Sequence, residues 1–299
     1  MELILNEKSL EGQFTDLGAF LETLPEMSKN LEILRKLGIG VWKHSCLYGR
    51  KVTGNLTLYD LNNKQGMIPA VHRDKVRKWK RELSWLTVSP PFWDAESEIG
   101  ENGAQAEISG AEESVSYLPC RDSIEEAARR RTDVLSFRHT DYLDRKLQVT
   151  YGGQNIPVKS VVTTRFLMEL LKQHEAVDAL FYLQNRFGTG RVAFDYLKEG
   201  TQSVNALQKA EFEEAMEALE RFDTAESWEH ILQDRFFCYK SYKPASRKKD
   251  YFAATDFADK KIDKFRCGQH SQVRCFGFRE KDKFYVLLFE RDHSLSDDG

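Results

Sequence analysis

The residue types best suited to holding phosphate gather between residues 260 and 299. Lys264 and Arg266 lie two positions apart, and Arg274 and Arg279 follow shortly after them. Lysine and arginine carry the positive charge that phosphate groups bind, and one arginine can donate two parallel hydrogen bonds to the same phosphate. This end of the chain therefore predicts a partner that is rich in phosphate.

Three predicted strands position these cations. Residues 264–266, 273–278 and 284–289 are rich in aromatic and β-branched side chains, and polar segments typical of turns separate them. Side chains two positions apart share one face of a strand, so Lys264 and Arg266 are expected to lie together. Arg266 and Arg274, on neighbouring strands, can hold one phosphate, or they can pair across the strands with carboxylates. The candidate carboxylates are Glu280, Asp282 and Glu290.

Charge is unevenly distributed along the chain. Residues 240–291 hold 14 Lys or Arg against 7 Asp or Glu, a net charge of +7, whereas the rest of the chain carries −10. A basic module is thus attached to an acidic body. Such a module is typical of proteins with phosphate-rich partners, although lysines at strand edges also serve to discourage edge pairing. The side chains expected to contact nucleic acid are Lys260, Lys261, Lys264, Arg266, Arg274 and Arg279.

Bulk composition limits the class of protein. With 299 residues, 41% of them hydrophobic and 30% charged, the chain is long enough for two or three globular domains. No apolar run approaches the roughly twenty residues of a membrane span, and the N-terminus lacks the features of a signal peptide. Five cysteines at no zinc-like spacing indicate neither a disulfide framework nor a zinc site. These features predict a cytoplasmic protein with no membrane contact, no metal and no cofactor.

Hydrophobic periodicity predicts a mixed, largely helical N-terminal region over residues 1–93. Residues 16–37 have near-helical spacing, with Thr15 or Asp16 as a cap and Pro25 as a break, so they form a helical pair or one kinked helix. Residues 38–42 are expected to turn into a strand.

The middle of the chain divides into two segments. Residues 94–119 are acidic, rich in Gly, Ser and Ala, and poor in large apolar side chains, so they predict a flexible linker. Residues 120–189 predict a central α+β region. In it, Asp122 caps a helix through residue 131, and Gly152-Gly153 forms the turn of a hairpin.

Residues 190–299 predict a strand, two helices and three strands, in that order. The first strand is expected at 191–196, and the helices at 207–222 and 228–232. The predicted fold class is therefore α+β, with a small antiparallel C-terminal sheet and two helices.

This order resembles the RelE/HigB superfamily of toxins, which are ribosome-dependent mRNA endonucleases. In the HigB-like branch a strand with an arginine pairs with an Arg-aromatic strand, and the last strand leads to a histidine. The matching residues here are Phe265-Arg266, Arg274-Cys275-Phe276 and Asp292-His293. The resemblance covers about residues 190–293, a third of the chain. A longer connection between the two arginines and a Lys/Asp-rich insertion at 242–261 depart from the family pattern.

The resemblance implies metal-independent cleavage of RNA. Such cleavage needs a base for the 2′-hydroxyl, cations for the crowded phosphate and an acid for the leaving oxygen. His293 is then the base or acid, Arg266, Arg274 and Lys264 hold the phosphate, and Tyr285 stacks on a base or transfers a proton. His293 can equally be a frayed surface side chain, and Tyr285 can equally belong to the core.

Other motifs have a structural as well as a functional interpretation. The helix expected at 73–88 carries cations around Trp79 and either tracks a nucleic-acid backbone or is a solvated helix with a tryptophan core stripe. Residues 187–191 are expected to form a turn. Four metal-capable side chains favour a surface loop over a metal site. These are His139, Asp141, Asp144 and His174.

The expected function is therefore an RNA-cleaving toxin or defence effector with a regulatory N-terminal region. One alternative is a non-catalytic module that binds nucleic acid or the ribosome, and another is an interaction subunit of a defence assembly. The expected partners are RNA or the ribosome and an antitoxin-like protein regulator. The acidic body can also occupy the basic sheet in cis.

Overall fold

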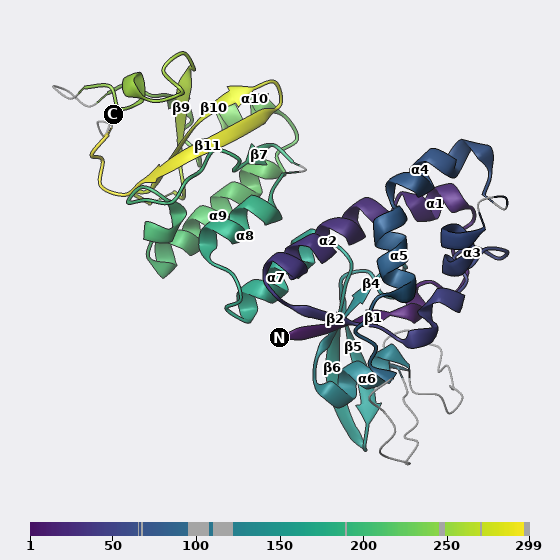
Figure 1. Ribbon diagram of the computed structural model, residues 1–299. Coiled ribbons are helices and arrows are strands. Elements are labelled where there is room, and N and C mark those ends of the chain that lie inside the picture. The colour runs from purple at the N-terminus through teal and green to yellow at the C-terminus, as the bar shows by residue number, and fades with distance from the viewer. Residues whose placement is uncertain are drawn as a thin grey trace. The chain divides into compact units, whose positions relative to one another are not determined.

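Figure 1 shows the computed structural model, which describes residues 1–64, 66, 68–94, 108–109, 122–188, 190–244, 249–269 and 271–295. The chain forms two compact units, Met1–Leu170 (unit 1) and Leu171–Gly299 (unit 2). Each unit combines helices with a mixed sheet, which confirms the α+β class. The segment expected to be a flexible linker, 94–119, lies outside the described residues except for Asp94 and one short strand.

Unit 1 is built on a sheet with the strand order β2-β1-β4-β6-β5-β3. Its first four strands in this order run parallel, and β5 and β3 run antiparallel to their neighbours. The strands are β1 (Glu2–Asn6), β2 (Gly40–Trp42), β3 (Ile108–Ser109), β4 (Asp133–Ser136), β5 (Arg145–Tyr151) and β6 (Gln154–Val161).

Strand β1 lies inside this sheet, although the sequence analysis assigned no strand there. Leu3, Ile4 and Leu5 are all fully buried, which is typical of a parallel strand covered on both faces. Because β1 pairs with β4, residues from the expected N-terminal and central regions share one sheet. The expected division at residue 94 therefore falls inside unit 1.

Helices cover the sheet of unit 1 on both sides (Figure 1). Helix α6 packs Ile124, Ala127 and Ala128 against Ile4 of β1 and Val134 of β4. The helices of this unit are α1 (Leu17–Leu21), α2 (Leu24–Lys36), α3 (Leu58–Asn63), α4 (Arg73–Lys78), α5 (Lys80–Val88), α6 (Ser123–Arg130) and α7 (Thr164–Gln173), the last of which continues into unit 2.

Several helix ends are where the sequence predicts them. Asp16 accepts a hydrogen bond from the backbone N–H of Ala19 at 2.9 Å, and Pro25 lies in the first turn of α2, so residues 16–37 do form a helical pair. Asp122 caps α6 as expected. The single helix expected at 73–88 is wrong in one respect, because the chain leaves helical geometry at Trp79 and forms α4 and α5 instead.

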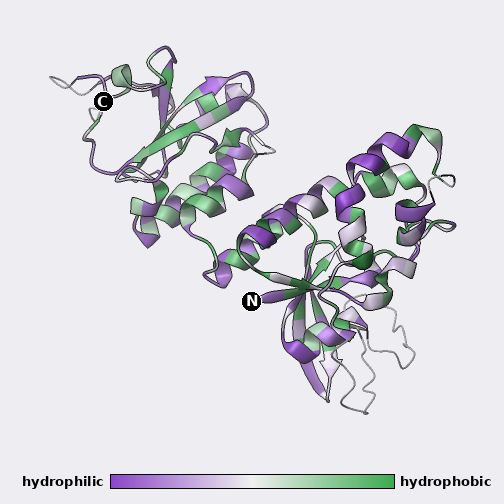
Figure 2. Cartoon of the chain, in the orientation of Figure 1, coloured by the Kyte–Doolittle hydropathy of each residue, from purple (hydrophilic) through white to green (hydrophobic). Residues whose placement is uncertain are grey.

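Unit 2 contains a five-stranded sheet with the order β7-β11-β10-β9-β8. Strands β9, β10 and β11 pair antiparallel as expected, and the short strand β7 pairs parallel with β11, so the sheet is mixed. Figure 2 shows how hydrophobic β11 is along most of its length. The elements are α8 (Ala179–Arg186), β7 (Val192–Ala193), α9 (Lys209–Asp223), α10 (Trp228–Gln233), β8 (Lys240–Ser241), β9 (Ile262–Arg266), β10 (Arg274–Glu280) and β11 (Lys283–Glu290).

Phe222 of α9 is the centre of the core on one face of this sheet. Its ring lies 4.7 Å from that of Phe265 in β9 and 5.4 Å from that of Phe284 in β11. Trp228 and Phe237 complete the cluster at 5.5 and 5.3 Å. Phe222 is fully buried, so this aromatic cluster fixes α9 to β9 and β11.

The opposite face of the sheet is also covered. Phe276 and Phe278 of β10 lie there in a second apolar cluster, together with Phe252 and the half-buried Tyr242 and Phe257. The last three belong to the insertion at 242–261, so that insertion covers the middle of the sheet face. The outer end of β9 and β10 carries charged side chains instead.

Candidate functional site

Arg266 and Arg274 lie directly opposite each other on β9 and β10. Glu290 of β11 lies opposite Arg274 in turn, so the three side chains form a row across the end of the sheet. We call Arg266 and Arg274 the arginine pair. Both arginines are half-buried, whereas Glu290 is fully buried. Like charges directly opposite each other are destabilising, so this pair is suited to an anion that neutralises its excess positive charge.

The connection between β9 and β10 holds both arginine side chains in place. Arg266 donates from Nη1 to the carbonyl of Gln269 at 2.9 Å. Arg274 donates from Nη1 to the carbonyls of Ser271 at 2.7 Å and Val273 at 3.2 Å. These contacts orient the guanidinium groups before any ligand binds, and they also stabilise the connection.

Two of the three carboxylates expected to neutralise the arginine pair lie elsewhere. Glu280 approaches Lys260 at 3.7 Å, and Asp282 pairs with Arg191. Glu290 is the one that lies in register with the pair.

Lys264 and Tyr285 both lie against rings of the second apolar cluster. Lys264 shares a face with Arg266 as expected, but its side chain is buried and its Nζ lies 5.9 Å from the ring centre of Phe276. Tyr285 stacks on Phe278 at 5.2 Å. The burial of Lys264 argues against the phosphate contact expected of it, and the ring of the half-buried Tyr285 is already stacked within the protein.

His293 lies beyond the sheet. Strand β11 ends at Glu290 and leads to His293, which has a left-handed backbone with φ of 53°. The backbone N–H of Leu295 donates to Oε1 of Glu290 at 2.5 Å, and Leu295 packs against the second apolar cluster. The chain therefore turns back after β11, and His293 is half-buried within this turn.

The remaining expected cations are spread over different surfaces. Lys261 is exposed, and Lys260 lies near Glu280 and 5.3 Å from the ring centre of Phe278. The guanidinium of Arg279 lies 4.0 Å from the ring centre of Trp228 in α10, on the face that the helices cover. Arg279 is therefore separated from the arginine pair by the sheet.

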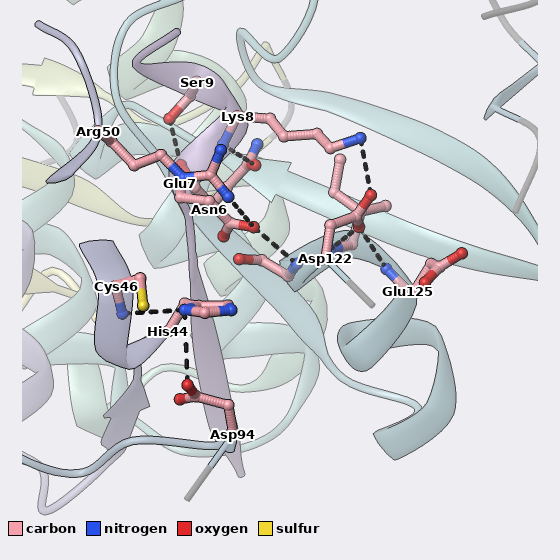
Figure 3. Close-up of polar contacts among 12 residues, drawn as sticks. Asn6, Glu7, Lys8, Ser9, His44, Cys46, Arg50, Asp94, Asp122 and Glu125 are labelled. Carbon is pink, nitrogen blue, oxygen red and sulfur yellow. Dashed lines mark hydrogen bonds and ion pairs between the residues drawn. The ribbon is translucent and has the colours of Figure 1, made fainter. Parts of the chain in front are cut away.

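A second cluster, which the sequence analysis missed, lies in unit 1 beyond the carboxyl end of β1. In the sheet, β2 lies next to β1 on one side, and β4, which comes later in the chain, lies next to β1 on the other side. Ligands of open α/β sheets bind at such a switch of direction, outside the carboxyl ends of the strands. Figure 3 shows the polar side chains that gather there, which we call the strand-end cluster. They include Glu7, Lys8, His44, Arg50, Asp94 and Asp122.

Glu7 is the centre of the strand-end cluster and is fully buried. Its Oε1 accepts a hydrogen bond from the backbone N–H of Ser123 at 3.2 Å and lies 3.8 Å from Nη2 of Arg50. Its Oε2 has no hydrogen-bond partner among the described residues. Burial, assisted by the nearby charge of Asp122, raises the pKa of Glu7 to about 7. This carboxyl therefore exchanges a proton close to neutral pH.

The neighbours of Glu7 are more fully paired. Nζ of Lys8 lies 2.7 Å from Oδ2 of Asp122, whose Oδ1 caps α6. His44 accepts the backbone N–H of Cys46 at Nδ1, and burial holds the pKa of His44 below its usual value against the opposing charge of Asp94. The imidazole is thus neutral at pH 7, with its proton on Nε2.

One sequence signal could have located the strand-end cluster. The polar run Asn6-Glu7-Lys8-Ser9 follows directly on the apolar residues of β1. A polar run that directly follows a buried strand marks the edge where α/β sheets place their functional side chains. The sequence analysis took these residues only as evidence against a signal peptide.

The described part of the chain holds neither a cluster of metal ligands nor a helix that could span a membrane. No cluster of three or more His, Cys, Asp or Glu side chains there could hold a metal ion. No helix within the same residues is long and apolar enough to cross a membrane.

Comparison of the chain with protein-family models, curated proteins and solved structures finds no match. The geometry of the two clusters is therefore the basis for assigning a function.

Proposed function

We propose that unit 2 binds RNA through the arginine pair and cleaves the bound strand with the help of His293. The observation that supports binding is the direct pairing of Arg266 with Arg274 on neighbouring strands, with their guanidinium groups held by backbone carbonyls. Two oriented guanidinium groups can donate several hydrogen bonds to one phosphate. A net charge of +7 over residues 240–291 attracts the rest of the strand.

Cleavage follows the chemistry of an internal transesterification. The 2′-hydroxyl attacks the phosphorus, the bond to the 5′-oxygen breaks, and a 2′,3′-cyclic phosphate and a 5′-hydroxyl result. The arginine pair offsets the charge that grows on the phosphate, and His293 takes or returns one of the two protons. Position supports this role, because His293 lies three residues after Glu290, the register partner of Arg274. The resemblance to the RelE/HigB superfamily supports the same reaction and a ribosomal context.

Binding without cleavage is the second candidate function. It is favoured by the burial of Lys264, because one of the five side chains expected to act in catalysis is not presented to a ligand, and by the stacking of the half-buried Tyr285 on Phe278. An RNA-binding module needs the arginine pair but not His293. The two candidates therefore make different predictions for these residues.

We expect the double variant Arg266→Glu/Arg274→Glu of the full chain to bind a labelled single-stranded RNA at least about tenfold more weakly than the wild type. The reversal also removes phosphate contacts, so the dependence of affinity on salt becomes shallower. Fluorescence anisotropy at several salt concentrations measures both effects. The matched control is Lys198→Glu/Lys209→Glu, which changes the charge equally at exposed positions of the same unit. Equal affinities for the two variants, each shown to be folded by circular dichroism, would contradict the proposal.

We expect His293→Ala to lower the rate of RNA cleavage by about 10²-fold or more while affinity stays within about twofold, because general acid–base groups contribute about 10²–10⁴-fold. Induced expression in bacteria, with growth and RNA ends as readouts, tests this in the cell. His230→Ala is the control, since His230 is an exposed histidine of α10. If wild type and His293→Ala both leave RNA intact while they bind it, binding without cleavage is the function.

A further inference from the structure

A second cationic surface lies in unit 1, along α4 and the first turn of α5. Six Lys or Arg side chains are exposed there, against the two carboxylates of Asp74 and Glu82. Arg77 lies 3.6 Å from Asp74 with both side chains mostly in solvent, a geometry that contributes little. Within the described residues, Lys78 and Lys80 have no ion-pair partner. The six are Arg73, Lys75, Arg77, Lys78, Lys80 and Arg81, and we call them the α4 surface.

The apolar side chains of these helices are used inside unit 1. Val76, Leu83 and Leu86 are all buried. A helix that lies on a membrane needs a free apolar face beside its basic one. Because α4 and α5 bury their apolar face in the core of unit 1, the α4 surface fits a hydrated polyanion better than a lipid bilayer.

A pocket of about 200 Å³ opens within the α4 surface. Its apolar lining comes from Leu61, Ile68 and Val76. Its cations are Arg73, Arg77 and Lys80, and none of the described residues that line it is a carboxylate. Sites for whole cofactors are larger, at roughly 300–1,000 Å³, so this pocket suits a single flat group with negative charge beside it. A nucleotide, with its base next to its phosphate, has that form.

Asn62 gives the pocket a polar wall. Its Nδ2 donates to Oγ1 of Thr87 at 3.3 Å, which fixes the amide so that Oδ1 is the free end. Oδ1 is buried and has no hydrogen-bond partner among the described residues. Asn62 is thus the uncharged polar side chain that lines the pocket, and an amide is a group that can hydrogen-bond the edge of a nucleobase.

We infer that the α4 surface is a second RNA-binding surface, in which the pocket receives one base and Arg77 and Lys80 contact the adjoining phosphates. The choice of RNA over other nucleic acids rests on the proposed function of unit 2, whereas the site itself is built entirely from residues of unit 1. Sequence-tolerant binding of single strands combines these same two elements, a place for a base and a cationic track for the backbone.

The test uses the full chain and a labelled single-stranded RNA of mixed sequence. The α4 variant is Arg77→Glu/Lys80→Glu. Its control is Lys36→Glu/Lys146→Glu, which changes the charge equally at exposed positions of unit 1. The control is matched further because Lys36, like Arg77, has a weak ion pair on its own helix. We expect the α4 variant to bind about tenfold more weakly. We also expect the slope of log affinity against log salt to become shallower by about 1.4, because two phosphate contacts are lost at about 0.7 each. We expect the control to stay within about twofold.

Each outcome separates this inference from the proposed function. Loss of binding in the α4 variant, with the arginine-pair variant unchanged, supports the α4 surface and removes the proposed site of unit 2. Loss in the arginine-pair variant alone removes the α4 surface and keeps the proposed function. Equal weakening in the α4 variant and its control would mean a general charge effect and would overturn the inference. Loss of binding to anionic vesicles in place of RNA would overturn it in favour of a membrane surface.

Discussion

The free energy of unfolding of unit 1 is expected to fall by about 3 kcal/mol as the pH rises from 4.5 to about 7, because the fully buried Glu7 keeps its proton over this range while the unfolded chain loses it. Below pH 4.5 the carboxyl is protonated in the folded and the unfolded chain, and its stabilising contribution is complete. Between 4.5 and about 7 the unfolded chain releases this proton while the folded chain keeps it, so stability is lost. Each pKa unit corresponds to about 1.4 kcal/mol, which gives the size of the effect.

Glu7→Gln is the variant that tests this expectation. The amide cannot ionise, so the fall in stability between pH 4.5 and 7 is expected to disappear, whatever the variant's absolute stability. Native-state hydrogen exchange of β1 and β4, measured across this pH range, reports on unit 1 separately. Parallel pH profiles for the wild type and Glu7→Gln would contradict the expectation.

Glu126 supplies a control, because its pKa is shifted in the opposite direction to that of Glu7. Burial alone would raise the pKa of its carboxyl, but hydrogen bonds from Arg129 and Arg130 outweigh burial and hold the pKa below its usual value. The stabilising contribution of Glu126 to folding is therefore present at neutral pH and lost on acidification. Glu126→Gln is expected to lower stability at pH 7 and to leave the loss between pH 4.5 and 7 in place.

The second large effect is expected at Phe222. Phe222→Ala removes the ring around which Trp228, Phe237, Phe265 and Phe284 pack, and large-to-small changes of this kind cost about 3–5 kcal/mol. The loss is expected in unit 2. Hydrogen exchange should rise in β9, β10 and β11 and stay unchanged in β1 and β4, which belong to unit 1.

Phe236→Ala is the matched control for this variant. Phe236 is half-buried and touches Phe237 from the edge of the cluster, at 5.3 Å between ring centres. Its loss should cost less than half as much, because less apolar surface returns to water. Comparable losses for the two variants, or a loss of protection in β1 and β4, would refute the assignment of Phe222 as the centre of the core of unit 2.

Local sequence signals located the helix ends well. Asp122 and Ser227 cap α6 and α10 where a capping residue precedes an amphipathic run, and Gly152-Gly153 turns between β5 and β6 with positive φ at both positions. These features depend on a few neighbouring residues, so the sequence contains their whole cause. The break at Trp79 has no such local signal, because the hydrophobic periodicity of residues 73–88 continues across it.

Long-range pairing and covering segments account for what the sequence analysis missed. Strand β1 is short, and its partner β4 lies about 130 residues further along the chain, as the hydrogen bond between Asn6 and Ser136 shows. The alternation of side chains along β9 correctly predicts that Lys264 and Arg266 share a face, but it cannot predict that Phe252 and its neighbours cover that face. Glu7 was missed for the same reason, since the residues it contacts, Arg50 and Ser123, are both distant in sequence.

The place of β11 in its sheet has a consequence for how the protein is made. This strand lies between β7 and β10, although both of them precede it in the chain. A ribosome therefore releases β7, α9, β9 and β10 before the strand that joins them exists. Until residue 290 emerges, the edge of β10 and the rings around Phe222 lack their cover, and nascent or prematurely terminated chains should be bound by chaperones or degraded by proteases.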